Sequence, residues 1–313
     1  MSTLSHKNNF AFFGSSSFSI YVLSALEQAG RVPSLIITTP DKPAGRKFTL
    51  TPTPVKVWAQ QRNIPVLDPA KLNADFISTF TSQAIALNIQ VAVVASYGKI
   101  IPQAVLDIPP RNTLNVHPSL LPKYRGASPV SSVILDDEKN TGVTIIRLDA
   151  EMDHGPILAQ ETLTIGTPTL PEWPTDEELQ KILGTQGGAL LAGILDQWIL
   201  GSITEREQDH TAATFTKKIE KEDAEITIAD ITQNPYATFR KIQAYHGWPS
   251  AFFFISKNSS TKTTDTDKKI RVKITAASYD STTDTLTIER IIPEGKTETK
   301  FEQFRANNRE LFN

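Results

Sequence analysis

The sequence predicts an α/β protein with a doubly wound, mostly parallel, Rossmann-like sheet, followed by a smaller β-rich, barrel-like (OB-like) C-terminal domain. Strand-like and helix-like segments alternate through the first 150 residues, which is typical of a parallel sheet with helices on both faces. Residues 89–96 form an almost continuous β-branched apolar run, as expected of a strand buried on both faces. Near the C-terminus, residues 271–278 and 285–292 alternate apolar and polar side chains, which indicates two antiparallel strands.

The predicted elements of the sheet region follow one another at short intervals. Apolar spacings of three and four predict helices, and short apolar runs closed by glycine or proline predict strands. The predicted strands are Phe10–Phe13, Pro33–Thr39, Ile64–Leu67, Ile89–Ser96, Leu114–His117 and Thr141–Leu148, and the predicted helices are Ser19–Ala29, Thr53–Arg62, Asp75–Ala84 and Ala127–Leu135. Gly14 stands without the further glycines of a dinucleotide-binding turn, which argues against a hydride-transferring enzyme.

The pattern of apolar residues and prolines changes after Glu161. Prolines predict a loop over Gly166–Asp176, and apolar spacing predicts a long helix over Asp176–Gly201, interrupted at Gly184–Gly188. The polar stretch that follows predicts a linker. We therefore expect a catalytic domain at residues 1–206, a linker at 207–213 and a C-terminal domain at 214–313.

Composition excludes several classes of chemistry. The 313 residues are 39% hydrophobic and 21% charged, which fits a globular protein with an ordinary core. The absence of cysteine excludes disulfides, zinc–thiolate sites, iron–sulfur clusters and a cysteine nucleophile. The net charge of −2 means that a polyanion would have to bind a local basic patch.

No apolar run approaches the roughly 18 to 20 residues that span a bilayer, and the N-terminal residues lack a signal-peptide layout. We therefore expect a cytoplasmic protein without membrane association.

The strongest functional signal is the segment LNVHPSLLPKYRG, residues 114–126. Asn115 and His117 are two residues apart in a predicted strand, so both side chains lie on the same face, at the strand end where sites form in this fold. Asp153 follows a later strand in RLDAEMDHGPIL and is an acidic candidate. A histidine beside a strand can also be purely structural, and an aspartate in such a loop also suits a turn. Arg125 either secures its loop or meets a charged ligand.

Six segments together are similar to the folate-dependent formyltransferases. They occur in the order FFGSSSF, TTPDKPAGRK, TPTPVKVWA, YGKIIP, LNVHPSLLPKYRGASP and GVTIIRLDAEMDHGPIL. The resemblance covers residues 8–205 and, more weakly, 214–313. It implies that Asn115, His117 and Asp153 are catalytic, that 10-formyltetrahydrofolate is the formyl donor, and that no metal takes part.

The resemblance also implies where the folate lies. Two segments match the family there, 95–102 and 119–122, and the residues that it assigns to folate are Tyr97, Gly98, Ile100, Ile101, Ser119, Leu120, Leu121 and Pro122. Their apolar side chains would form the walls of a pterin site, although each one alone is equally consistent with core packing.

Two features resemble the members that formylate the initiator methionyl-tRNA. One is the long loop PDKPAGRKFTLTPTP with Arg46 and Lys47. The other is the added C-terminal domain, which opens with TKKIEKEDAEI and carries Lys217, Lys218 and Lys221. These five residues are the implied tRNA contacts. We therefore expect a monomeric enzyme that formylates the α-amino group of methionyl-tRNA for translation initiation. Sugar-nucleotide N-formyltransferases, with the same donor and triad, remain the alternative, and a non-enzymatic RNA-binding module is a third hypothesis.

Overall fold

The computed structural model describes residues 9–44, 49–167, 173–256 and 269–309. By their internal contacts they form two compact units. The first takes the chain up to residue 129, with 140–164 and 180–216, and the second takes 130–139, 165–179 and the chain from 217 onward. The domain boundaries predicted at 206 and 214 stay a prediction.

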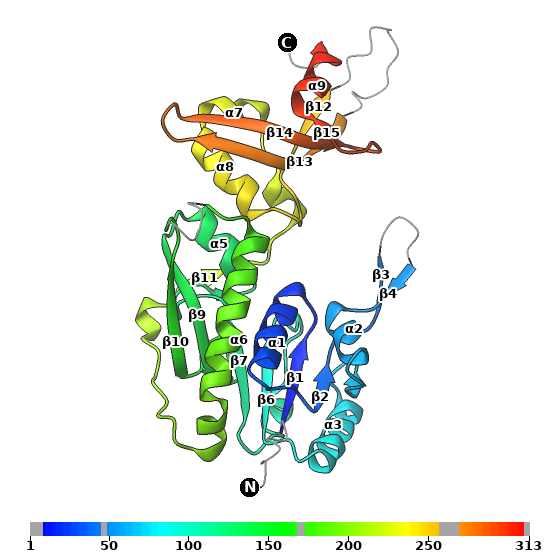
Figure 1. Ribbon diagram of the computed structural model, residues 1–313, viewed down its shortest axis with the longest axis vertical. Helices are drawn as coiled ribbons and strands as arrows, with labels where there is room; N and C mark the ends of the chain where they lie inside the picture. The colour runs from blue at the N-terminus through cyan, green and yellow to red at the C-terminus, as the bar shows by residue number, and fades with distance from the viewer. Residues whose placement is uncertain (1–8, 45–48, 168–172, 257–268, 310–313) are drawn as a thin grey trace. The chain divides into compact units, whose positions relative to one another are not determined.

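The first unit is built on a seven-stranded sheet with the order β10-β9-β7-β6-β1-β2-β5 (Figure 1). The five strands from β7 to β5 are parallel to one another, whereas β9 is antiparallel to both of its neighbours. The strands are β1 (Phe10–Gly14), β2 (Leu35–Ile37), β5 (Val66–Leu67), β6 (Val91–Ala95), β7 (Thr113–His117), β9 (Asn140–Arg147) and β10 (Ile157–Thr164). The predicted α/β fold class is confirmed, although the edge strand β10 and the antiparallel direction of β9 were not foreseen.

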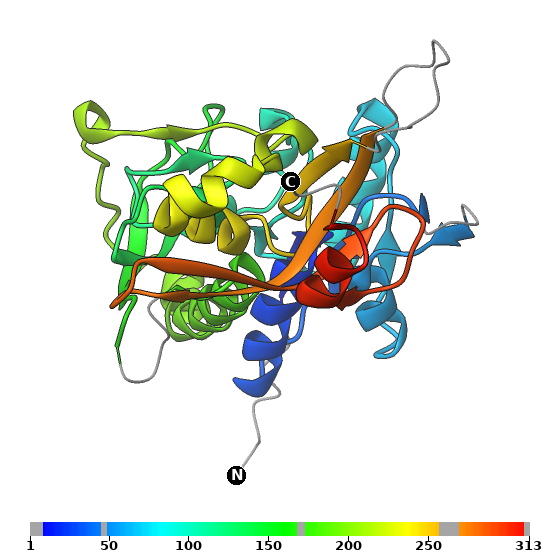
Figure 2. The same cartoon turned by 90° about the horizontal axis from the view of Figure 1, so that it is seen from above.

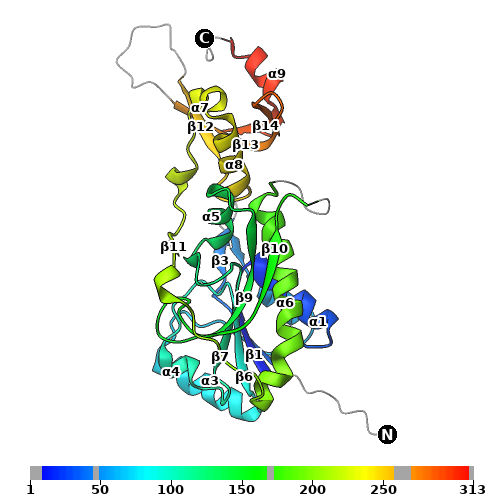
Figure 3. The same cartoon turned by 90° about the vertical axis from the view of Figure 1, so that its left-hand side faces the viewer.

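Helices cover both faces of this sheet, as Figure 3 shows for α1 and α6 on one side and α3 and α4 on the other. The helices of the unit are α1 (Ser17–Gln28), α2 (Pro54–Gln60), α3 (Ala74–Ala86), α4 (Gln103–Leu106) and α6 (Asp176–Leu200), the last of which begins in the second unit. Phe76 and Phe80 of α3 and Val105 of α4 pack against buried residues of β1, β2 and β6. These contacts bury strand residues that alternate along the chain, as two-fold side-chain periodicity requires.

The interruption expected in the long helix is wrong, because α6 is continuous over its 25 residues. Its glycines permit close packing. A Cβ on Gly187 would lie 2.5 Å from Val116 Cγ1, and one on Gly188 would lie 2.5 Å from the Val22 carbonyl oxygen of α1. Each glycine destabilises the helix by about 1 kcal/mol relative to alanine. Glycine is nevertheless required here, because a larger side chain would separate the helix from the sheet. Among the helices in the described ranges, none is both long and apolar enough to cross a membrane.

The second unit contains a four-stranded antiparallel sheet, β12-β13-β14-β15. Figure 2 shows the long strands β13 and β14 in orange, with α7 and α8 in yellow. Its elements are α5 (Pro129–Leu135), α7 (Ile228–Gln233), α8 (Pro235–Ala244), β12 (Phe252–Ser256), β13 (Lys269–Asp280), β14 (Thr285–Pro293), β15 (Thr299–Lys300) and α9 (Phe301–Ala306). Its core includes Ile242, Phe253, Val272 and Ile291. The prediction of a β-rich C-terminal region with antiparallel strands is confirmed.

Candidate active site

Three predicted catalytic side chains meet at the carboxyl end of β7. Asn115 Nδ2 donates to Asp153 Oδ1 at 3.2 Å, and His117 Nδ1 lies 3.6 Å from Asp153 Oδ2. Parallel pairing sets Asn115 beside Val94 of β6, and antiparallel pairing sets it beside Ile146 of β9. The trio therefore lies near the middle of the sheet, where open α/β sheets bind their ligands.

Asp153 reaches this position through a loop with unusual backbone geometry. The loop joins β9 to β10, and Asp153 has a φ of +50° in the left-handed region, which is uncommon for a residue with a side chain. At Gly155 a Cβ would lie 1.8 Å from the Arg147 carbonyl oxygen, so the chain can pass there only with glycine. The Gly126 N–H donates to Asp153 Oδ2 at 2.8 Å, which gives the carboxylate a second direct hydrogen bond.

His117 is held from the other side of its ring. Its Nε2 lies 2.9 Å from the Tyr124 carbonyl oxygen, and since a carbonyl only accepts, Nε2 carries a proton. Nδ1 then faces Asp153 at ion-pair distance, too far for a direct hydrogen bond. His117 is only 4% exposed, so a charge on its ring would act in a water-poor environment. The direct hydrogen bonds of Asp153 thus go to Asn115 and Gly126, while its relation to His117 is electrostatic.

The residues assigned to folate from the motifs divide into buried and exposed ones. Ser119 is buried, and its Oγ donates to the Lys123 carbonyl oxygen at 2.7 Å. Leu121 is buried with Ile146 and Ile157 close to the trio, whereas Leu120 and Pro122 are partly buried. In the other segment Ile101 is partly buried in the core, whereas Ile100 is 90% exposed. Gly98 has a φ of +78°, which favours glycine at this tight turn.

Tyr97 is the one member of this set with a buried polar group that lacks a partner. Its ring packs edge-on against Phe13, with centroids 5.4 Å apart. No hydrogen-bond partner for its hydroxyl is found within the described part of the chain. Burial raises the pKa of the Tyr97 phenol to about 12, so it is a neutral donor over the ordinary pH range.

The five predicted tRNA contacts fall in two parts of the chain. Arg46 and Lys47 lie outside the described residues, between β3 (Lys42–Ala44) and β4 (Thr49–Thr51). Lys217, Lys218 and Lys221 are exposed in the second unit. Lys217 Nζ is paired with Asp223 at 2.6 Å, and Lys218 Nζ lies 3.8 Å from a Glu220 oxygen, so their positive charge is partly offset.

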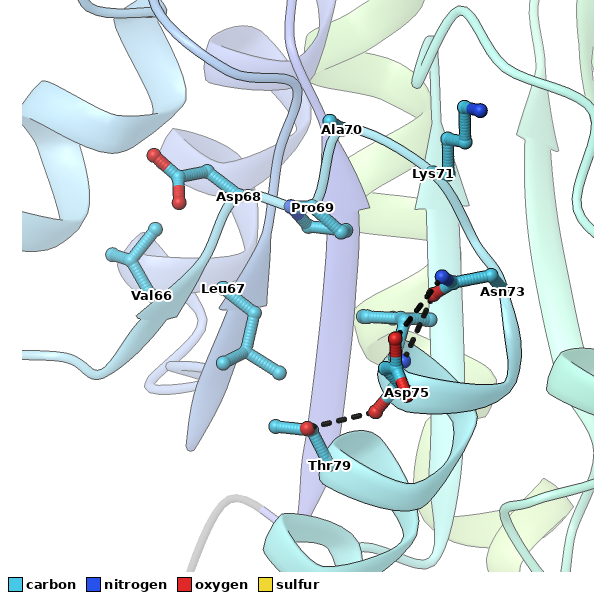
Figure 4. Close-up of a pocket in the computed structure, with 10 residues that line it drawn as sticks. Val66, Leu67, Asp68, Pro69, Ala70, Lys71, Asn73, Asp75 and Thr79 are labelled. Atoms are coloured by element: carbon cyan, nitrogen blue, oxygen red, sulfur yellow. Dashed lines mark hydrogen bonds between the residues drawn. The ribbon is translucent and has the colours of Figure 1, made fainter.

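A cavity of about 490 Å³ lies elsewhere in the first unit, beside β5 and the start of α3 (Figure 4). Its lining residues are Val66, Leu67, Asp68, Pro69, Ala70, Lys71, Asn73, Asp75, Phe76 and Thr79, none of which belongs to the trio. Asn73 caps α3 by accepting from the Phe76 N–H, and Thr79 Oγ1 donates to the Asp75 carbonyl oxygen. Asn73 and Thr79 are thus engaged with the backbone of α3.

Two buried residues beside the trio were missed or left open by the sequence analysis. Gln208 falls in the predicted linker but is 5% exposed, and Arg125 is 3% exposed. Arg125 Nη2 donates to Gln208 Oε1 at 2.7 Å. Gln208 stands in a polar stretch of the sequence, so nothing in the local pattern predicts its burial. Its contact with Arg125 joins residues 83 positions apart. Within the described ranges, no three histidine or acidic side chains gather as a metal site would require.

Fold and site together define an α/β enzyme whose trio offers an amide donor, an imidazole and a carboxylate. The family model described as Formyl transferase matches residues 8–187. The chain belongs to the formyl transferase family, as the sequence motifs predicted.

Two named relatives show how similar this sequence is to other members of the family. Methionyl-tRNA formyltransferase of Chloroflexus aggregans is 45% identical over 244 residues, which are 78% of this chain and 75% of that protein. The protein of the same name from Thermus thermophilus is 39% identical over 247 residues, again 78% of this chain and 75% of that one.

Solved structures show the same fold at low identity. Methionyl-tRNA formyltransferase from Clostridium thermocellum matches with a TM-score of 0.55 and 16% identity over 91% of this chain and 98% of that one. A sugar N-formyltransferase from Shewanella matches with a TM-score of 0.59 and 14% identity, over 84% of this chain and 99% of that one. These structural likenesses therefore establish the fold, and the sequence relatives carry the argument about substrate.

Proposed function

We propose that this enzyme transfers the formyl group of 10-formyltetrahydrofolate to the α-amino group of initiator methionyl-tRNA, for translation initiation in the cytoplasm. The observation that carries the proposal is the identity of 36–45%, over about 78% of the chain, to proteins named methionyl-tRNA formyltransferase. The sugar-nucleotide alternative has weaker support, because the relatives that match at 36–45% identity are named methionyl-tRNA formyltransferase.

Asn115 is proposed to stabilise developing negative charge. When the amine nitrogen attacks the formyl carbon, charge builds on the formyl oxygen, and an amide N–H aimed at that oxygen stabilises it. The Asn115 side chain has two N–H groups, and one of them donates to Asp153 Oδ1 at 3.2 Å. The second N–H would serve the substrate, while the Asp153 contact fixes the plane of the amide.

His117 is proposed to move the proton of the attacking amine. Its ring is fixed by the Tyr124 carbonyl oxygen, and its Nδ1 faces the Asp153 carboxylate at 3.6 Å. Nδ1 is the ring nitrogen without a proton, so it can accept the proton of the attacking amine and return it to N10 of tetrahydrofolate, the leaving group, when the bond between the formyl carbon and N10 breaks. Asp153 would thus orient Asn115 directly, while its carboxylate faces the imidazole of His117 at 3.6 Å.

The residues around the trio suit a pterin-bearing donor, which when bound supplies the formyl group. Leu121, Ile146 and Ile157 form an apolar cluster there, and Leu148 packs against both this cluster and the core that contains Tyr97. The unpartnered Tyr97 hydroxyl is a donor that a heterocycle could satisfy. Apolar walls with a few placed polar groups are typical of cofactor sites.

Replacement of Tyr97 by phenylalanine tests this assignment through opposite effects on stability and binding. We expect the free energy of unfolding to rise by about 1 kcal/mol, because an unsatisfied buried hydroxyl is removed. If the hydroxyl donates to the folate, the dissociation constant for a folate analogue should rise about 2- to 12-fold, as the loss of one net hydrogen bond predicts. Urea unfolding and isothermal titration measure the two effects.

Tyr245 provides the matched control for this experiment, since it is a buried tyrosine in the second unit. Tyr245→Phe should leave folate affinity unchanged. An unaltered folate affinity in Tyr97→Phe, together with higher stability, would show that Tyr97 only fills the core.

The exposed lysines of the second unit are proposed to contact tRNA phosphates. Each phosphate contact that is lost should lower the salt dependence of tRNA binding by about one in the log–log slope. Lys218→Ala and Lys221→Ala are expected to show this change more fully than Lys217→Ala, because Lys217 is already paired with Asp223 at 2.6 Å. Filter binding of methionyl-tRNA between low and moderate salt measures the slopes, with Lys181→Ala on α6 as the control. If all four variants keep the wild-type slope, these lysines are not phosphate contacts.

One assay tests the proposed function as a whole. Purified protein is given 10-formyltetrahydrofolate with methionyl-tRNA, other aminoacyl-tRNAs or UDP- and dTDP-amino sugars. Formylation of methionyl-tRNA alone is the expected result. Formylation of an amino sugar instead would assign the chain to the sugar-nucleotide enzymes, and no folate binding by titration would favour a non-enzymatic RNA-binding protein.

A further inference from the structure

The predicted linker contributes a buried side chain beside the trio. Both ends of the Gln208 carboxamide are used: Oε1 accepts from Arg125 Nη2 at 2.7 Å and from Nε at 3.2 Å, and Nε2 donates to the carbonyl oxygens of Asp153 at 2.8 Å and Gly155 at 2.7 Å. An amide nitrogen has two N–H donors, and both are aimed at the loop that carries Asp153. Gln208 therefore holds the backbone of Asp153 while Asn115 and Gly126 hold its carboxylate.

Arg125 depends on Gln208 for its own burial. Its guanidinium donates to Gln208 and to His210 Nδ1 at 2.8 Å, and within the described part of the chain no carboxylate lies at ion-pair distance from it. A buried charge without an acidic partner needs well-placed neutral acceptors, because its desolvation is costly. Gln208 supplies two of these contacts, so the two side chains fix each other.

The same contacts reach His117. Arg125 lies between Tyr124, whose carbonyl oxygen accepts from His117, and Gly126, whose N–H donates to Asp153. Residues Arg125–Gly126 form β8, which pairs in parallel with β11 (Phe215–Thr216), a few residues beyond Gln208. Thr214 also accepts the Tyr124 N–H through its hydroxyl at 2.8 Å. The segment 208–216 is thus bonded to both loops that hold the trio.

We propose that Gln208 is a positioning residue for formyl transfer, which rests on the proposed function above. Its carboxamide holds Asp153 in the left-handed conformation that brings the carboxylate to Asn115 and His117. Through Arg125 it ties this loop to the segment that fixes the His117 ring. It touches neither substrate, so its effect is on the geometry of the trio.

Gln208→Glu is the sharpest variant, since it preserves shape and an acceptor for Arg125. It removes both N–H donors and sets carboxylate oxygens against the carbonyl oxygens of Asp153 and Gly155. We expect kcat to fall about 10- to 100-fold, because misplacing a catalytic group by about 1 Å has effects of this size. The KM for each substrate should change by less than about threefold, and the pH profile of kcat should shift because the carboxylate no longer faces His117 in the same way.

Hydrogen exchange gives a readout that does not depend on activity. Peptides that cover 122–128 and 149–156 should exchange faster in Gln208→Glu, since the Gly126 N–H loses its fixed acceptor. Gln243→Glu is the matched control, because Gln243 Nε2 donates to the Trp173 carbonyl oxygen at 2.9 Å in the second unit. It should change neither peptide nor kcat.

Each outcome either supports or overturns the positioning role of Gln208. A kcat within twofold of wild type with an unchanged pH profile overturns the proposal, whatever exchange shows, and so does unchanged exchange in both peptides. If wild type does not formylate methionyl-tRNA, the proposed function fails, while faster exchange in Gln208→Glu alone would still show that Gln208 positions Asp153. If Gln208→Glu does not fold, Gln208→Asn, which is one methylene too short, and Arg125→Lys, which lacks the guanidinium fork, carry the same expectations.

Discussion

Replacement of His117 by alanine is expected to lower kcat for formyl transfer about 10²- to 10⁴-fold, the range that general acid–base catalysis contributes. The imidazole is the group of the trio whose two nitrogens are both placed, with Nε2 on the Tyr124 carbonyl oxygen and Nδ1 facing Asp153. On the proposed mechanism, the attacking amine of this variant would lack a positioned group to take its proton. Initial rates with saturating 10-formyltetrahydrofolate and methionyl-tRNA measure the loss.

Two further variants separate chemistry from folding. His117→Ala leaves the Tyr124 carbonyl oxygen without its donor, which costs about 1–3 kcal/mol of stability, so its melting temperature must be measured beside the rate. His117→Gln retains an N–H donor near Tyr124 and should melt closer to wild type, yet it should be as inactive as alanine. His246→Ala in the second unit should keep full activity. Turnover near wild type in His117→Gln would contradict the role given to the imidazole.

Local pattern was enough to predict the strand end that carries Asn115 and His117. Two residues spaced two apart on a β-strand share a face, and a parallel sheet presents its strand ends at one edge. Asp153 is different, because nothing near it in the sequence predicts a left-handed φ of +50° or an approach to β7. Its place in the trio followed from resemblance, and its main hydrogen-bond partners, Asn115 and Gly126, came only from the fold.

The misses have a common physical cause, which is contact between distant parts of the chain. Gln208 bonds residues 55 and 53 positions away, and no periodicity marks a single glutamine as buried. The glycines of α6 were taken as a break because glycine disfavours helix, but the sheet residues Val116 and Val143 leave no room for a side chain at Gly187. Tertiary packing decided both positions against local preference.

The predicted folate residues show the same limit. Tyr97 and Ile100 are three residues apart in one motif, yet Tyr97 is 2% exposed and Ile100 is 90% exposed. The tight turn at Gly98, with its positive φ, separates them. A motif can therefore place a segment at a site without stating which of its side chains face the ligand, and Tyr97→Phe is chosen because it tests one side chain alone.

Replacement of Asn115 by alanine is expected to lower kcat about 10²- to 10³-fold, equivalent to about 2.7–4 kcal/mol of transition-state stabilisation, as for other single oxyanion donors. The KM for either substrate should change little, because the N–H acts on charge that develops during reaction. Single-turnover kinetics report the chemical step directly. Asn140→Ala, at the exposed start of β9, is the control and should react at the wild-type rate.

The double variant Asn115→Ala/His117→Ala gives the most direct evidence that the two side chains act together. Groups that serve one transition state are non-additive, so the double variant should lose far less than the product of the two single losses. Asp153 couples them, since it bonds Asn115 at 3.2 Å and faces His117 at 3.6 Å. Fully multiplicative losses would mean that the amide and the imidazole contribute independently, and the trio would then not act as one unit.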